Sequence, residues 1–140
     1  MKAIHISFLL VAIVHSAYAQ TFFVSRKDAM DIACRHYALS KSYDRHGFEE
    51  LKPELLFERT NNDTTTWYAV GFSNRPGKVF VSATELAYPI IGSTATSGFD
   101  TADVSPALLW LLRKHENKIL ELIRSTKSGK HTPALQSEWE

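Results

Sequence analysis

The chain has 140 residues, with 16 basic and 15 acidic side chains and a formal net charge of +1 at pH 7. Such an even balance provides no field that would gather nucleic acid or anionic lipid, so neither class of partner is favoured. The only cysteine, Cys34, has no second thiol with which to form an internal disulfide.

The first 19 residues have the pattern of a secretory signal peptide. Lys2 supplies a positive start, residues 4–14 are mostly apolar, and Ala17 and Ala19 frame an A-x-A cleavage site. The apolar run is shorter than the roughly 20 residues that span a bilayer, and no cysteine directly follows the cleavage site to accept a lipid. We predict cleavage between Ala19 and Gln20, no membrane insertion, and export to the periplasm or the medium.

The mature chain should begin with a helix from residue 26 to about residue 39. Ser25 followed by Asp28 is typical of a capping box. Residues suited to a buried helix face then recur at helical spacing. They are Ala29, Ile32, Ala33, His36 and Tyr37. A loop-like linker over residues 44–53 follows.

Short strands alternate with polar turns in the middle of the chain. The turns are predicted at residues 61–63 and 73–77. The predicted strands are residues 55–59, 65–72, 78–83 and 89–94. Trp67 and Tyr68 lie on opposite sides of their strand, so at most one of them belongs to the core if one sheet face is open.

In the third predicted strand, Val79 and Val81 face one side of the sheet. Lys78, Phe80 and Ser82 face the other side. A helix before and a helix after these strands predict an α+β fold, with a small antiparallel sheet of about four strands packed against an N-terminal helix and a long C-terminal helix.

The last helix has the clearest start, because Ser105 is a good N-cap and Pro106 suits the first helical position. One broad apolar face follows. It consists of Leu108, Leu111, Leu112, His115, Ile119, Leu122 and Ile123. We place the domain over residues 20–125 and a flexible tail over residues 126–140.

Residues that carry chemistry are sparse. The histidines of the mature chain, His36, His46, His115 and His131, have no metal-ligand spacing, and no second cysteine could complete a zinc site. Cys34 and His36 are two residues apart on the predicted helix and so point to different faces. We therefore predict a protein that is not an enzyme and that has no metal and no cofactor.

Several segments, in the same order and at the same spacing, resemble the propeptide of streptopain-type cysteine proteases, including interpain. They are WYAV at 67–70, GKVFVS at 77–82, PIIG at 89–92 and GFD at 98–100, followed by the long helix. The resemblance covers roughly residues 21–125. Residues 132–135 and Trp139 are similar to the junction where the mature protease begins, yet the chain ends at Glu140 without the catalytic cysteine or histidine.

This resemblance implies inhibition, because the family domain docks on a papain-like enzyme and blocks its active site. The same domain also occurs as a separate inhibitor encoded beside such a protease. In the streptopain zymogen an asparagine just before the last helix approaches the catalytic centre, and Ser105 holds that position here. We expect an inhibitor that is monomeric before it binds a streptopain-type cysteine protease. The predicted inhibitory loop is Phe99, Asp100, Thr101, Ala102, Asp103, Val104 and Ser105.

Other interpretations stay open. Asn74, Arg75 and Trp110 are predicted as secondary contacts because arginine and tryptophan dominate interface hot spots, but each also suits a turn or the edge of the core. Phe99 also suits the core, with residues 100–105 forming a turn and a helix cap. Two alternative functions are a severed or truncated propeptide that acts as a latency and folding domain, and a surface-binding module that does not inhibit.

Overall fold

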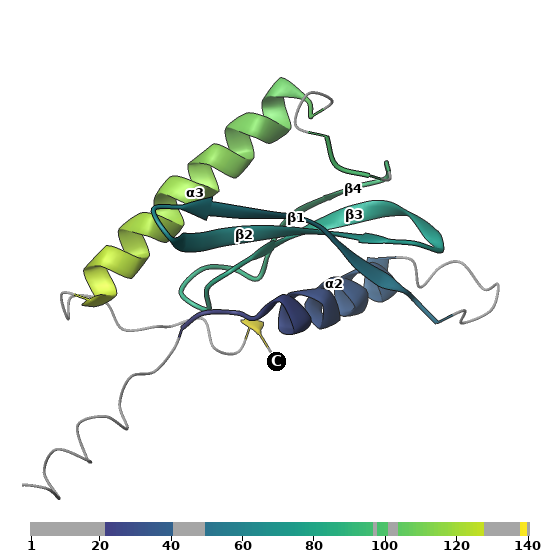
Figure 1. Cartoon of the computed structure of the whole chain (residues 1–140), viewed down its shortest axis with the longest axis horizontal. Coiled ribbons are helices and arrows are strands. Elements are labelled where there is room, and N and C mark those ends of the chain that lie inside the picture. The colour runs from purple at the N-terminus through teal and green to yellow at the C-terminus, as the bar shows by residue number, and fades with distance from the viewer. Residues whose placement is uncertain (1–21, 41–49, 97, 101–103, 128–137, 140) are drawn as a thin grey trace, which may run out of the picture.

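The computed structural model describes residues 22–40, 50–96, 98–100, 104–127 and 138–139. They form an α+β fold in which α2 (Arg26–Ser40) precedes a four-stranded sheet and α3 (Pro106–Lys127) follows it (Figure 1). The strands are β1 (Pro53–Asn61), β2 (Thr64–Phe72), β3 (Arg75–Ser82) and β4 (Ile90–Thr94). The predicted fold class is confirmed.

The sheet is an antiparallel meander in which each strand pairs with the next one along the chain. Asn62 and Asp63 form the turn between β1 and β2, with φ angles of 47° and 61°. Asparagine and aspartate tolerate this left-handed conformation, and two such residues give a turn whose twist matches the paired strands. The polar turn expected from the sequence therefore closes the first hairpin.

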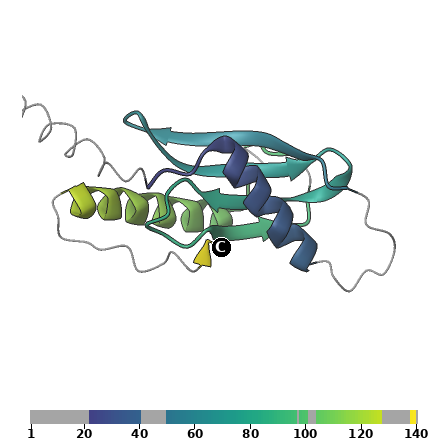
Figure 2. The same cartoon turned by 90° about the horizontal axis from the view of Figure 1, so that it is seen from below.

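The two helices cover opposite faces of the sheet, as the two views together show (Figures 1 and 2). On the α2 face, Ala29 and Ala33 of the helix form a buried cluster with Val70, Val79 and Val81 of the sheet. Burying each large apolar side chain contributes about 1.5–3 kcal/mol, so this layer holds α2 in place. The predicted orientation of the two β3 valines is confirmed.

On the α3 face, Leu112 packs with Trp67, Ala69 and Phe80. Glu116 lies one turn further along α3 and is also buried, at 6% exposure. Its carboxylate accepts hydrogen bonds from Arg59 at 3.2 and 3.3 Å and from Asn61 at 3.0 Å. These bonds attach the middle of α3 to the end of β1.

Trp67 and Tyr68 are both in the core, each 5% exposed, and they belong to opposite faces of β2. The Tyr68 hydroxyl donates a hydrogen bond of 2.8 Å to the carbonyl oxygen of Val24. The expectation that at most one of the two would be buried assumed an open sheet face. That assumption is wrong, because a helix covers each face.

The boundaries of several elements differ from the sequence-based prediction. β1 runs from Pro53 to Asn61, beyond the predicted residues 55–59, because two more residues at each end pair with β2. α2 ends at Ser40 and α3 at Lys127, so α3 extends two residues into the predicted tail. Side-chain patterns located these elements correctly but not the residues at their ends.

Trp139, near the end of the chain, shares the lining of a surface pocket with Asp28, Asp31 and Ile32 of α2. Its indole Nε1 donates a hydrogen bond of 3.1 Å to the carbonyl oxygen of Ala87, and its ring packs against the core under α2. Residues 128–137 of the predicted tail lie outside the described residues. The chain therefore returns at Trp139 to the face of the sheet opposite α3.

Candidate partner-binding loop

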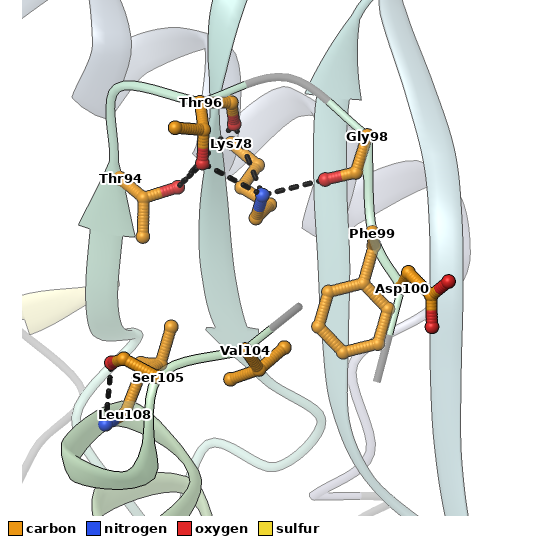
Figure 3. Close-up of a pocket in the computed structure, with 9 residues that line it drawn as sticks. All are labelled: Lys78, Thr94, Thr96, Gly98, Phe99, Asp100, Val104, Ser105 and Leu108. Carbon is orange, nitrogen blue, oxygen red and sulfur yellow. Dashed lines mark hydrogen bonds between the residues drawn. The ribbon is translucent and has the colours of Figure 1, made fainter. Parts of the chain in front are cut away.

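The predicted inhibitory loop joins the end of the sheet to α3. The structure describes Phe99, Asp100, Val104 and Ser105 of this loop, whereas residues 101–103 (Thr101, Ala102 and Asp103) lie outside the described residues. Figure 3 shows the described loop residues around a cleft that they share with β3, β4 and α3. The loop is thus attached to the body of the protein on both sides.

Phe99 anchors the first side of the loop. Its ring belongs to an aromatic cluster on the α3 face, with ring centroids 4.9 Å from Phe57, 5.9 Å from Phe80 and 6.1 Å from Trp67. Tilted and edge-on pairs at such distances stabilise a cluster beyond simple burial. Phe99 therefore matches the core interpretation, and it holds the neighbouring residues in place.

Ser105 anchors the second side. Its hydroxyl Oγ accepts a hydrogen bond of 3.3 Å from the backbone N–H of Leu108, and its carbonyl oxygen accepts one of 2.9 Å from Leu109. This is the N-cap geometry that the sequence predicts, since the first N–H groups of a helix have no partner inside the helix. The hydroxyl is thus already engaged with α3.

Lys78 of β3 is the buried charged group of this region, with 7% exposure. Its ammonium group donates hydrogen bonds to the carbonyl oxygen of Thr96 at 3.0 Å, the Thr96 hydroxyl at 3.2 Å and the carbonyl oxygen of Gly98 at 2.6 Å (Figure 3). Burial lowers the pKa of Lys78. The residues just before Phe99 are therefore fixed by a cation from the middle of the sheet.

The cleft beside the loop has a volume of about 540 Å³. Hydroxyl groups of Thr94, Thr96 and Ser105 line it together with apolar Val104 and Leu108. A mixed lining of this kind provides hydrogen-bonding groups and apolar surface to a peptide or side chain of a partner.

Groups suited to other chemistry are not gathered in the described part of the chain. No three histidine, cysteine, aspartate or glutamate side chains among those residues lie close enough to hold a metal ion. Cys34 is half-buried against the core under α2, and burial raises the pKa of its thiol. None of the helices described has the length and apolar character needed to cross a bilayer.

The three residues predicted as secondary contacts have different structural environments. The side-chain oxygen of Asn74 accepts a hydrogen bond of 3.0 Å from the Lys52 N–H, and its amide nitrogen donates one of 2.9 Å to the Glu50 carbonyl. Half-exposed Arg75 begins β3. Trp110 is 64% exposed on α3, with the ammonium group of Lys114 5.0 Å from its ring centre. These three residues do not line the cleft beside the loop.

Sequence reasoning assigned no role to Lys78 or Glu116. For both residues the sequence pattern indicates a buried position. Lys78 lies on the same side of β3 as Phe80, and Glu116 lies four residues after Leu112 on the apolar face of α3. A charged residue at a position that periodicity marks as buried must find hydrogen-bond partners. Those partners identify the loop and the end of β1 as the segments that the two residues hold.

Comparisons with family models, with curated proteins and with solved structures returned no match for this chain.

Proposed function

We propose that this chain is an exported inhibitor of a streptopain-type cysteine protease and that the loop of residues 99–105 blocks the active-site cleft of the enzyme through its exposed positions. The observation that carries the proposal is the anchoring of this loop on both sides, by the Phe99 ring and by the Ser105 cap. A loop whose two ends are held in place before binding loses less conformational entropy when it docks, and this raises affinity. The resemblance of residues 67–100 to the family propeptide supplies the class of partner.

In this proposal, the exposed part of the loop makes the contact and the buried part supports it. Asp100 is exposed, whereas Phe99 is half-buried in the aromatic cluster. Substitutions at exposed loop positions should therefore weaken inhibition without unfolding the protein. Substitution of Phe99 should instead affect folding and inhibition together.

The first experiment is a titration of the protein from Gln20 to Glu140 against an active streptopain-type protease, with papain as a specificity control. Residual activity on a peptide substrate is followed as inhibitor is added. We expect stoichiometric loss of the streptopain-type activity and no loss of the papain activity. Absence of inhibition at micromolar concentration against several streptopain-type enzymes would contradict the proposal and favour a binding module.

A loop variant tests where the inhibitory surface lies. Replacing residues 100–103 with a Gly-Ser sequence of equal length keeps Phe99 and the Ser105 cap, so the fold should persist. We expect the inhibition constant to rise at least about tenfold, because loop contacts and preorganisation are both lost. Asp31→Ser, an exposed change on α2, is the matched control and should leave inhibition unchanged. Unchanged inhibition by the loop variant would move the inhibitory surface elsewhere.

A further inference from the structure

The ammonium group of Lys78 makes hydrogen bonds that an apolar side chain at the same position could not make. Lys78 lies on the α3 face of β3, on the same side as Phe80, and its aliphatic stem needs no charge to pack there. Burying an ammonium group costs free energy unless hydrogen bonds replace its hydration. The three acceptors that provide these bonds are therefore the reason that a lysine fits this position.

All three acceptors come from one short stretch of chain. Two are atoms of Thr96 and the third is the carbonyl oxygen of Gly98, which immediately precedes Phe99. An ammonium group has three N–H donors, so the described contacts use all of them. Among the described residues, no carboxylate lies within ion-pair distance of Lys78. In the contacts described, the charge of Lys78 is thus directed at the backbone and hydroxyl that lead into the loop.

Gly98 lies between the Lys78 contacts and the anchored Phe99 ring. It adopts a φ of 71°, in the left-handed region that favours glycine, and, its chain neighbours apart, nothing lies within 4 Å of the place where a β-carbon would stand. A glycine is also the residue that gains most conformational freedom when its contacts are removed. Within the described part of the chain, the bond of 2.6 Å from Lys78 is the hydrogen bond that holds its carbonyl group.

We infer that Lys78 is a positioning residue for protease binding, which clamps Thr96 and Gly98 so that Asp100 is presented in its bound conformation. This inference rests on the proposed function, because it explains how the same loop is held before it meets the enzyme. Without the hydrogen bonds from Lys78, residues 98–100 lose conformational entropy only when they bind the enzyme, and this loss lowers the affinity.

The test uses Lys78→Met, which keeps a long flexible side chain and removes the charge. Lys118→Met is the matched control, because Lys118 is an exposed lysine of α3. Backbone 15N relaxation gives the order parameters of residues 98–100 and of Val79 and Val81 in the core, and the inhibition constant is measured on the same proteins. In Lys78→Met we expect the order parameters at 98–100 to fall from about 0.85 towards the flexible range below about 0.6, the core values to stay unchanged, and the inhibition constant to rise by about tenfold.

Rescue separates positioning from a general effect of the substitution. In a Cys34→Ala background, Lys78→Cys is treated with bromoethylamine while unfolded, which replaces the thiol proton with an aminoethyl group and restores an ammonium at the length of lysine. After refolding, both the high order parameters and strong inhibition should return. If Lys78→Met does not fold, Thr96→Val removes one acceptor at an exposed position and should lower the order parameter of Gly98 to a smaller extent.

The outcomes distinguish this inference from the proposed function. Unchanged order parameters at residues 98–100 in the variants overturn the clamp, whatever the inhibition data show. Lowered order parameters with an unchanged inhibition constant overturn the link between the clamp and binding. If the unaltered protein inhibits no streptopain-type protease, the proposed function fails, and the role of Lys78 in binding fails with it, while the relaxation data still decide whether Lys78 orders the segment.

Discussion

Glu116→Gln tests how α3 is attached to the sheet. The Glu116 carboxylate is 6% exposed and is bonded to Arg59 and Asn61 of β1. Removing one partner of a fully buried ion pair costs about 3–5 kcal/mol, because the remaining charge is left without hydration. Here the Arg59 side chain is 46% exposed, so water can solvate it when the carboxylate is lost. We therefore expect Glu116→Gln to lower the free energy of unfolding by about 1–2 kcal/mol.

Urea unfolding followed by far-ultraviolet circular dichroism measures this change. Glu121→Gln is the matched control, because Glu121 lies on the same helix, is 72% exposed and pairs with Lys118 at 3.4 Å. Exposed pairs of this kind contribute between about 0 and 1 kcal/mol, so Glu121→Gln should have a small effect. Equal effects of the two substitutions would refute the reasoning, since they would mean that the buried network does not stabilise α3 on β1.

Three further predictions concern the N-cap of α3, the glycine at position 77 and the ion pair of Glu58. Ser105→Ala removes the N-cap of α3 and should lower the free energy of unfolding by about 1 kcal/mol in urea; Ser105→Gly should cost only a few tenths. Gly77→Ala should destabilise the protein by about 1–3 kcal/mol in the same assay, because Gly77 has a φ of 109° and a β-carbon would lie 2.9 Å from the carbonyl oxygen of Thr94. A neutral result would show that this backbone relaxes without strain. The hydrogen bond from Arg26 lowers the pKa of the Glu58 carboxyl below 4.5. The ionised carboxylate therefore stabilises the fold above that pH, and this stabilisation is lost as the pH falls through the lowered pKa. Glu58→Gln should therefore be less stable than the unaltered protein at about pH 7, with a difference that shrinks towards about pH 3; a difference independent of pH would contradict the assignment.

Much of the fold could be predicted because the signals are local in the sequence. The capping hydrogen bond from the Asp28 N–H to the Ser25 hydroxyl spans three residues, and the turn at Asn62 and Asp63 spans two. Alternation within β3 predicted which residues face which side, since it depends only on the pleat. The order of the elements then gave the α+β class.

The features that could not be predicted are contacts between residues that lie far apart along the sequence. The partners of Lys78 lie 18 and 20 residues away, and those of Glu116 lie 55 and 57 residues away. Trp139 meets Ala87 across 52 residues. Periodicity marks such positions as buried but does not name their partners, which is why the candidate loop was located from its flanking elements while its clamp was missed.

The three tryptophans of the chain provide built-in optical reporters of three different regions. Trp67 lies in the aromatic cluster next to Phe99, Trp110 is open to solvent on α3, and Trp139 is seated beside α2. A soluble quencher such as iodide should therefore reduce emission from Trp110 first and from Trp67 last. Three variants that each retain one tryptophan would give separate fluorescence signals without any attached dye. The variant with Trp67 would report unfolding of the core, the one with Trp110 the outer surface of α3, and the one with Trp139 the packing of that residue beside α2.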